Sequence, residues 1–197
     1  LFHSFELIGN IANIEKIKDQ ISKLSASESR IFINGPTGSG KELIARKIHK
    51  LSKRYKGPFV ILNGALLDAK KYEQELFGEE KTNGAILYGA LEKASKGILL
   101  IDEVSEIPLE TQSKILRVLI DQKFKRINGN HDINVDVRII CSSSKDIKNE
   151  INIGNFREDL FHRLNVFQID VEPLSSRISD IPLLIDYFSK KIADNYN

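Results

Sequence analysis

The hydrophobic positions of this chain alternate between short continuous runs and longer stretches with helical spacing. A continuous run of large aliphatic residues is typical of a strand that is buried on both faces of a parallel sheet. Such runs predict strands at residues 30–34, 59–63, 97–103, 137–141 and 165–171. Because helical segments separate these strands, we expect an α/β fold with a parallel five-stranded sheet between helices.

Apolar residues spaced three and four apart predict the helices. In the first helix, the apolar face consists of Ile14, Ile17, Ile21 and Leu24. Further helices are expected at residues 43–51, at residues 66–78 and after Pro108. The helix after Pro108 has a predicted inner face of Ile115, Leu116, Leu119 and Ile120. Each of these helices therefore has one face that can cover the sheet.

Three segments fall outside this alternation. Turn residues in the middle of residues 124–137 predict a hairpin, and residues 81–89 are expected to form a loop. Beyond the last strand, Ser179 and Asp180 precede Pro182, a combination that starts a helix. We therefore divide the chain into an α/β core at residues 1–172 and a linker with the first helix of an incomplete helical lid at residues 173–197.

The segment between the first strand and the next helix has the composition of a phosphate-binding loop. It consists of Gly35, Pro36, Thr37, Gly38, Ser39, Gly40, Lys41 and Glu42. A strand, a glycine-rich turn and a helix form the context of a P-loop, in which backbone N–H groups and the helix N-terminus surround an anion. Lys41 is expected to reach the terminal phosphates of a nucleoside triphosphate. Glu42 stands where most P-loops have a Ser or Thr that helps to hold Mg²⁺, so the metal needs another ligand or more water.

Two acidic residues, Asp102 and Glu103, end the third predicted strand. In an α/β sheet, this end of the strands is where ligands bind. An apolar run that ends in Asp-Glu is weak evidence alone, but with a P-loop upstream it indicates a Walker B element. Asp102 would then hold Mg²⁺, and Glu103 would polarise the water that attacks the γ-phosphate.

Composition excludes several classes of protein. The 197 residues are 41% hydrophobic and 28% charged, with a net charge of +2, which favours a soluble globular domain without a strongly basic DNA-binding surface. The single Cys141 excludes an internal disulfide and fits a reducing cytoplasm. No apolar stretch approaches the roughly 20 residues that cross a bilayer, so we expect a cytoplasmic protein without membrane contact. There is no Met, even at position 1, so we expect a segment of a longer protein.

Eight short motifs follow one another along the chain. They are Leu7-Ile8-Gly9, Gly40-Lys41-Glu42, Gly57-Pro58-Phe59 leading to Asn63, Glu75-Leu76-Phe77-Gly78, Leu100-Ile101-Asp102-Glu103, Phe156-Arg157-Glu158-Asp159-Leu160, Arg163-Leu164-Asn165-Val166 and Asp180-Ile181-Pro182-Leu183. In these motifs and their order, the chain resembles the AAA+ ATPase domains of sigma-54 activators, the NtrC/NtrX-type two-component response regulators or bacterial enhancer-binding proteins, from Leu7 almost to its end. An acidic residue after the P-loop lysine is usual in this family. The resemblance implies an AAA+ P-loop NTPase fold and the cofactors ATP and Mg²⁺.

The resemblance also implies roles for residues outside the two Walker motifs. Ile8 and Gly9 match positions that bind the nucleotide, and Asn63 matches the residue that restrains the catalytic glutamate. Ser144 occupies the place of the sensor I asparagine and is expected to contact phosphate or water less firmly, because it is shorter. The sensor II arginine belongs to the part of the lid that this chain does not include.

Arg157 and Arg163 match the arginine fingers that reach the γ-phosphate of a neighbouring subunit. A guanidinium stabilises the charge of phosphoryl transfer, so the resemblance implies a homo-oligomeric ring, a hexamer or heptamer, that is active only when assembled. From the residues alone, the alternative is that both arginines pair with Glu158 or Asp159 on an exposed helix.

The segment at residues 81–89 departs from the family pattern, which has a projecting Gly-Ala-Phe-Thr-Gly-Ala loop that contacts the sigma factor. Here the segment is several residues shorter, and Ile86-Leu87-Tyr88 replaces the tip. Three functions remain open: an ATP-driven motor that remodels the sigma-54 holoenzyme, an assembly module that acts through ordinary polymerase, and another AAA+ remodelling ATPase. The short loop favours the second function, and Tyr88 is a poor pore residue for the third. DNA contact is expected only through a helix-turn-helix domain absent from this chain.

Overall fold

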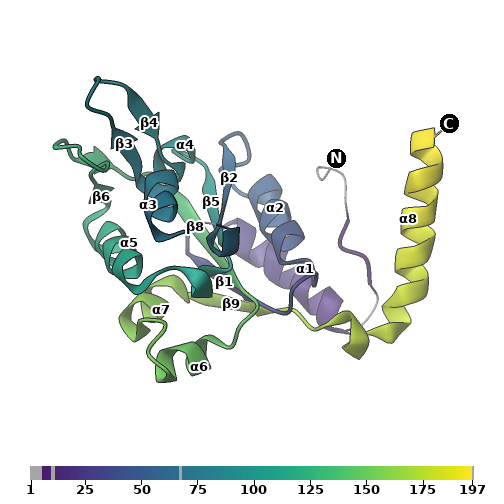
Figure 1. The fold of residues 1–197 in the computed structure, drawn as a ribbon. Helices are drawn as coiled ribbons and strands as arrows, with labels where there is room; N and C mark the ends of the chain where they lie inside the picture. The colour runs from purple at the N-terminus through teal and green to yellow at the C-terminus, as the bar shows by residue number, and fades with distance from the viewer. Residues whose placement is uncertain (1–5, 10–11, 67, 197) are drawn as a thin grey trace.

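The computed structural model describes residues 6–9, 12–66 and 68–196, and its centre is a parallel five-stranded sheet (Figure 1). The strand order is β2-β5-β8-β1-β9. These strands are β1 (Ile31–Asn34), β2 (Phe59–Asn63), β5 (Ile98–Asp102), β8 (Arg138–Ser143) and β9 (Phe167–Asp170). All neighbouring strands of this sheet pair in parallel, so the predicted sheet and its five strands are confirmed.

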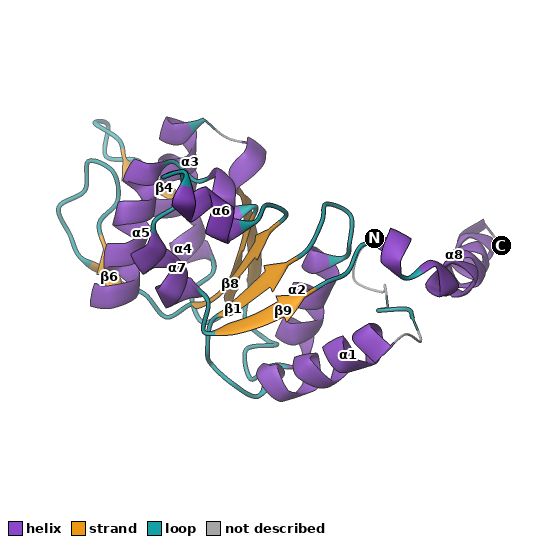
Figure 2. Ribbon diagram, turned by 90° about the horizontal axis from the view of Figure 1, so that it is seen from below, coloured by secondary structure: helices purple, strands orange, loops and turns teal. Residues whose placement is uncertain are grey.

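The sheet is covered on both faces because successive residues of each strand point to opposite sides. On β1, Phe32 belongs to one apolar cluster and Ile33 to the other. The cluster of Ile33 includes residues of α1 (Ala12–Ser25) and α2 (Lys41–Leu51). The cluster of Phe32 includes residues of α3 (Ala69–Phe77), α4 (Ala90–Lys93), α5 (Leu109–Asp121) and α7 (Glu158–Leu164). Figure 2 shows these two groups of helices on either side of the strands.

The helices follow the predicted ranges with two differences. The helix expected at residues 66–78 begins only at Ala69, after Asp68 accepts a hydrogen bond from the Lys71 backbone N–H at 2.9 Å; position 67 lies outside the described residues. In α5, Ile120 was expected on the inner face but is 53% exposed. Val118 takes the inner position instead, since it lies three residues from Ile115 and so shares its face.

The remaining helical segments are short. They are α6 (Ile147–Asn152) and the 3-10 turns η2 (Gly64–Leu66), η3 (Val104–Glu106), η4 (Leu174–Ser176) and η5 (Ile178–Asp180). After η5 the chain forms α8 (Ile181–Tyr196), with Pro182 in its first turn as predicted. In Figure 1, α8 stands apart from the layers that cover the sheet.

Two hairpins project from the layer of α3, α4 and α5. The predicted hairpin within residues 124–137 is confirmed as β6 (Lys123–Phe124) paired with β7 (Ile133–Asn134). The expectation of a loop at residues 81–89 is wrong for residues 86–88, because β3 (Gly78–Glu80) pairs with β4 (Ile86–Tyr88). Ile127 explains this pairing: it exchanges two backbone hydrogen bonds of 2.9 Å with Gly78 and Glu80, and so gives β3 a partner on its second edge.

Arg126 joins these two hairpins to α4. Its guanidinium donates to both oxygens of Glu92, at 2.8 and 2.6 Å, and to Glu80 Oε1 at 3.0 Å. It also lies over the ring of Tyr88, 5.3 Å from the centroid. The Glu92 carboxylate raises the pKa of Arg126 above its ordinary value. One side chain therefore connects β3, β4, α4 and the β6–β7 segment.

Candidate functional site

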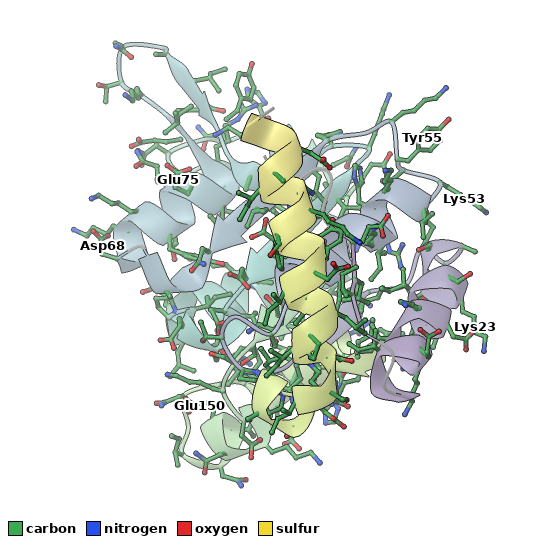
Figure 3. The ribbon with its side chains drawn as sticks, turned by 90° about the vertical axis from the view of Figure 1, so that its right-hand side faces the viewer. Lys23, Lys53, Tyr55, Asp68, Glu75 and Glu150 are labelled. Carbon is green, nitrogen blue, oxygen red and sulfur yellow. The ribbon has the colours of Figure 1, made fainter. Side chains whose placement is uncertain are left out.

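The predicted nucleotide site lies at the carboxyl ends of β1 and β5, where a cavity of about 610 Å³ opens. The predicted residues that line this cavity are Ile8, Thr37, Gly38, Ser39, Gly40, Lys41, Glu42, Asp102 and Glu103. In Figure 3, α8 crosses in front of the molecule, with Lys23 and Lys53 at one edge and Asp68 and Glu75 at the other. The inner side of α8 contributes Leu184 and Phe188 to the cavity.

The P-loop is held open by its glycines. Gly38 and Gly40 have φ angles of 78° and 101°, a left-handed region that other residues adopt only with strain. A Cβ at either position would have no atom within 4 Å, so nothing in the described chain fills the space beside them. The hydroxyl of Ser39 is buried and has no hydrogen-bond partner in the part of the chain that the structure describes. An open cradle of backbone with an unsatisfied buried hydroxyl fits a phosphate ligand.

Lys41 begins α2 and is only 6% exposed. Its ammonium group donates to the carbonyl oxygens of Gly35, at 2.8 Å, and Pro36, at 3.2 Å. It also pairs with Glu103 Oε1 at 3.3 Å. A buried charge is stable only when it is paired and hydrogen-bonded, and these three contacts meet that condition. Gly35 and Pro36 thus contribute to the site by positioning Lys41.

Asp102 ends β5 directly beside Asn63 of β2, in the register of the parallel pair. Its two oxygens accept hydrogen bonds from Asn63 Nδ2, at 2.9 Å, and from Ser142 Oγ. The family resemblance implied that Asn63 restrains Glu103, but in this structure its amide donates to Asp102 instead. The strand register explains the difference, because it brings Asn63 opposite Asp102 rather than Glu103.

Glu103 leaves the strand with a φ of 52°, a left-handed conformation that turns its side chain back toward the P-loop. One carboxylate oxygen accepts from both the backbone N–H and the hydroxyl of Ser144, at 2.9 and 2.8 Å. The other oxygen faces Lys41. The structure thus places Ser144 on the predicted catalytic carboxylate, 41 residues away in sequence.

Glu42 and Gly9 have partners of their own. Glu42 accepts from Arg46 Nε at 2.7 Å, one turn further along α2. Gly9 packs against Asp180, so closely that a Cβ would lie 2.6 Å from a carboxylate oxygen. Gly9 therefore connects the N-terminal segment to η5, beside the cavity rather than in its lining.

Arg157 and Arg163 lie outside the cavity lining. Arg157 forms a two-pronged pair with Asp159, at 3.0 and 2.7 Å, and donates to Ser113 Oγ at 3.0 Å. Its hydrogen bonds raise the pKa of Arg157 and lower that of Asp159. For Arg157, the ion pair considered as an alternative is therefore present. Arg163 is exposed on α7. Burial of Arg30 lowers the pKa of its guanidinium, and repulsion from the positive charge of Arg163 lowers it further.

Sequence reasoning missed part of the lining. These residues are Glu6, Leu7, Leu43, Arg46, Leu174, Arg177, Leu184 and Phe188. They come from four separate segments, so no local motif connects them. Two of them, Leu184 and Phe188, share a face of α8 at a spacing of four, which is the one signal that could have indicated them.

The described residues contain no group of three or more His, Cys, Asp and Glu side chains placed to hold a metal ion. Asp102 nevertheless fits Mg²⁺, which proteins often bind through one or two carboxylates together with substrate phosphates and water. Within the described part of the chain, no helix has both the length and the apolar composition to cross a bilayer.

Comparison with known proteins identifies the family. A sequence profile described as the Sigma-54 interaction domain matches residues 7–170. The chain belongs to the Sigma-54 interaction domain family. This Sigma-54 interaction domain is 46% identical over 183 residues to the nitrogen assimilation regulatory protein NtrX of Azorhizobium caulinodans, an alignment that covers 92% of this chain and 40% of the relative. It is 42% identical over 192 residues to the DNA-binding transcriptional regulator NtrC of Proteus hauseri, covering 95% and 41%.

Solved structures agree with this assignment. The crystal structure of NtrX from Brucella abortus in complex with ATP superposes with a TM-score of 0.92 at 46% identity, over 97% of this chain and 42% of that one. The P-loop NTPase domain of a sigma-54 transport activator from E. coli shares the fold, with a TM-score of 0.58 at 18% identity over 85% of this chain and 99% of that one. The resemblance and fold predicted from the motifs are therefore confirmed. The Sigma-54 interaction domain described here spans about two fifths of the length of its NtrX and NtrC relatives.

Proposed function

We propose that this domain binds ATP with Mg²⁺ and hydrolyses it to ADP and phosphate. The observation that carries this proposal is that the open P-loop, Lys41, Asp102 and Glu103 all line one cavity. The crystal structure of NtrX from Brucella abortus is a complex with ATP, and this supports ATP as the nucleotide. The apolar lining from Leu7, Leu43 and Phe188 suits a purine base, while the P-loop suits the phosphates.

Hydrolysis requires the side chains of the site to exchange partners. Lys41 would leave Glu103 and donate to the terminal phosphates, since these carry more negative charge than one carboxylate. Asp102 would hold Mg²⁺, which when bound neutralises charge on the phosphates. Glu103 would then leave Ser144 and accept a proton from the attacking water. We propose that Ser144 controls Glu103 directly, and that Asn63 acts on it through Asp102.

Arg157 and Arg163 are proposed to act on the nucleotide of a neighbouring subunit in a ring of six or seven copies. Neither arginine lines the cavity of its own chain, and Arg163 is exposed on α7. For Arg157 to act in this way, it must release Asp159. Both side chains of this pair are exposed, so water weakens their attraction and competes for their hydrogen bonds.

For the whole regulator, we propose a transcription factor of a two-component system in which residues 1–172 are the ATPase core and residues 173–197 begin the lid. In the first candidate function, a motor that remodels the sigma-54 holoenzyme, a sigma factor would contact the β3–β4 hairpin, which exposes Ile86, Leu87 and Tyr88. DNA contact would come from another domain. The second candidate is a nucleotide-controlled assembly module that acts through ordinary polymerase. The shortness of residues 81–89 relative to the family pattern favours this second candidate, as do the Arg126 contacts, which restrain the hairpin.

Replacement of Lys41 tests ATP binding. We expect Lys41→Ala to weaken ATP binding by roughly a hundredfold, because each charge-assisted hydrogen bond to phosphate contributes about 1.5–3 kcal/mol. The affinity is measured by isothermal titration calorimetry with MgATP. Lys50→Ala is the matched control, since Lys50 is exposed on the same helix outside the cavity lining and should bind ATP like the wild type. An unchanged affinity in Lys41→Ala would refute the assignment of the P-loop.

A further inference from the structure

The nucleotide cavity contains a buried arginine to which no motif assigns a role. Arg177 lies between η4 and η5 and is 7% exposed. Its backbone is fixed at both ends: its N–H donates to the Leu174 carbonyl at 3.0 Å, and its carbonyl accepts from the Asp180 N–H at 3.0 Å. From this fixed backbone, Arg177 lines the cavity, and its guanidinium reaches the P-loop at Ser39.

The contacts of this guanidinium leave its charge poorly compensated. Nη2 donates to the Ser39 carbonyl of the P-loop at 3.3 Å, and Nη1 lies 3.7 Å from Asp180 Oδ2, beyond hydrogen-bond distance. Nε is buried and has no hydrogen-bond partner among the described residues. A buried arginine with an unsatisfied N–H is costly unless a ligand or water completes its contacts.

Arg177 lies farther from a carboxylate than Lys41 and Arg46, two other cations that line the cavity. Lys41 pairs with Glu103 at 3.3 Å, and Arg46 pairs with Glu42 at 2.7 Å. For Arg177, the shortest carboxylate distance is longer, and its unsatisfied Nε is accompanied by the unsatisfied hydroxyl of Ser39. Two unsatisfied buried groups beside a P-loop indicate that an anionic group completes this part of the site.

We propose that Arg177 binds the phosphate chain of the nucleotide directly. This inference rests on the proposed function, because it assumes that the cavity takes a nucleotide. The contact lies on the segment that leads into α8, so it links the phosphates to the start of the lid helix. A guanidinium is suited to this task because its planar set of donors matches phosphate oxygens.

Competition against a fluorescent ADP analogue tests the contact. In the wild type, inorganic pyrophosphate and adenosine are each measured for their ability to displace N-methylanthraniloyl-ADP. We expect Arg177→Gln to weaken competition by pyrophosphate about tenfold and to change competition by adenosine less than twofold. Lys47→Gln is the charge-matched control, since Lys47 is on α2 outside the cavity lining, and it should leave both competitions unchanged.

The outcomes separate the two proposals. A wild type that does not bind the fluorescent ADP refutes the proposed function itself. A wild type that binds it, with equal pyrophosphate competition in Arg177→Gln, refutes only the role of Arg177. An equal loss for pyrophosphate and adenosine also refutes it, because it would show that Arg177 acts through packing. If Arg177→Gln does not fold in a thermal unfolding scan, Arg177→Lys is measured instead, where only a loss selective for pyrophosphate supports the contact.

Discussion

Replacement of Arg126 by Met should destabilise the domain by a magnitude that the structure sets. The side chain of Arg126 is 13% exposed and that of its main partner Glu92 is 14% exposed, so the pair is neither fully buried nor at the surface. Breaking a buried ion pair costs about 3–5 kcal/mol, whereas exposed pairs contribute about 1 kcal/mol or less. We therefore expect a loss of about 2 kcal/mol, since Glu92 and Glu80 would both lose the cation that they share.

The assay is chemical and thermal unfolding of the single variant, of Glu92→Gln and of the double variant. For a chain of this size, a loss of about 2 kcal/mol lowers the Tm by about 4–8 °C. The double variant should lose about 1 kcal/mol less than the sum of the losses of the two single variants, because Arg126 and Glu92 are then both replaced and neither is left without the other. Arg117→Met, an exposed position on α5, is the control and should change stability by less than about 0.5 kcal/mol. An Arg126→Met variant within that same range would refute the reasoning.

Three further predictions concern the site and the core. Glu103→Gln should keep ATP affinity and lose turnover, measured by phosphate release, because an amide cannot accept the proton of the attacking water; normal turnover would remove Glu103 from this role. Arg163→Ala should lower ATPase activity only at concentrations where the wild type assembles, as followed by analytical ultracentrifugation, and a defect independent of concentration would contradict action between subunits. Burial raises the pKa of the Cys141 thiol, so iodoacetamide at pH 8.5 should label it only after unfolding; labelling of the folded chain at the unfolded rate would contradict this burial.

Local patterns in the sequence were sufficient for the sheet and for the P-loop. Each central strand is a continuous apolar run, and the glycine spacing around Lys41 is a local requirement for backbone N–H groups to face an anion. The sequence was less informative for α6 and α7, since helices of six and seven residues are too short to show periodicity. The β3–β4 pairing was also missed, because its stabilising contact with Ile127 comes from a distant part of the chain.

Contacts within the site depended on the fold rather than on motifs. The register of β2 and β5 determines that Asn63 meets Asp102, and residues 41 positions apart in sequence meet when Ser144 binds Glu103. Arg177 carries no local signature, because its role follows from burial and from an unsatisfied N–H. Sequence therefore predicted the P-loop and the two acidic groups of the site, whereas the structure was needed to show how they are paired and that Arg177 lies among them.

The ion pair between Lys41 and Glu103 has a consequence for ligand selection. Any molecule that captures the ammonium group must outcompete a carboxylate that is already in place. A carboxylic acid metabolite offers no more charge than this internal competitor, and a single phosphate, with a charge of about −1.5 to −2, offers little more. A triphosphate offers far more, so the domain would ignore abundant small anions. The same ion pair, together with the hydrogen bonds from Ser144, occupies the Glu103 carboxylate, so this group could act as a base only after a ligand has taken Lys41.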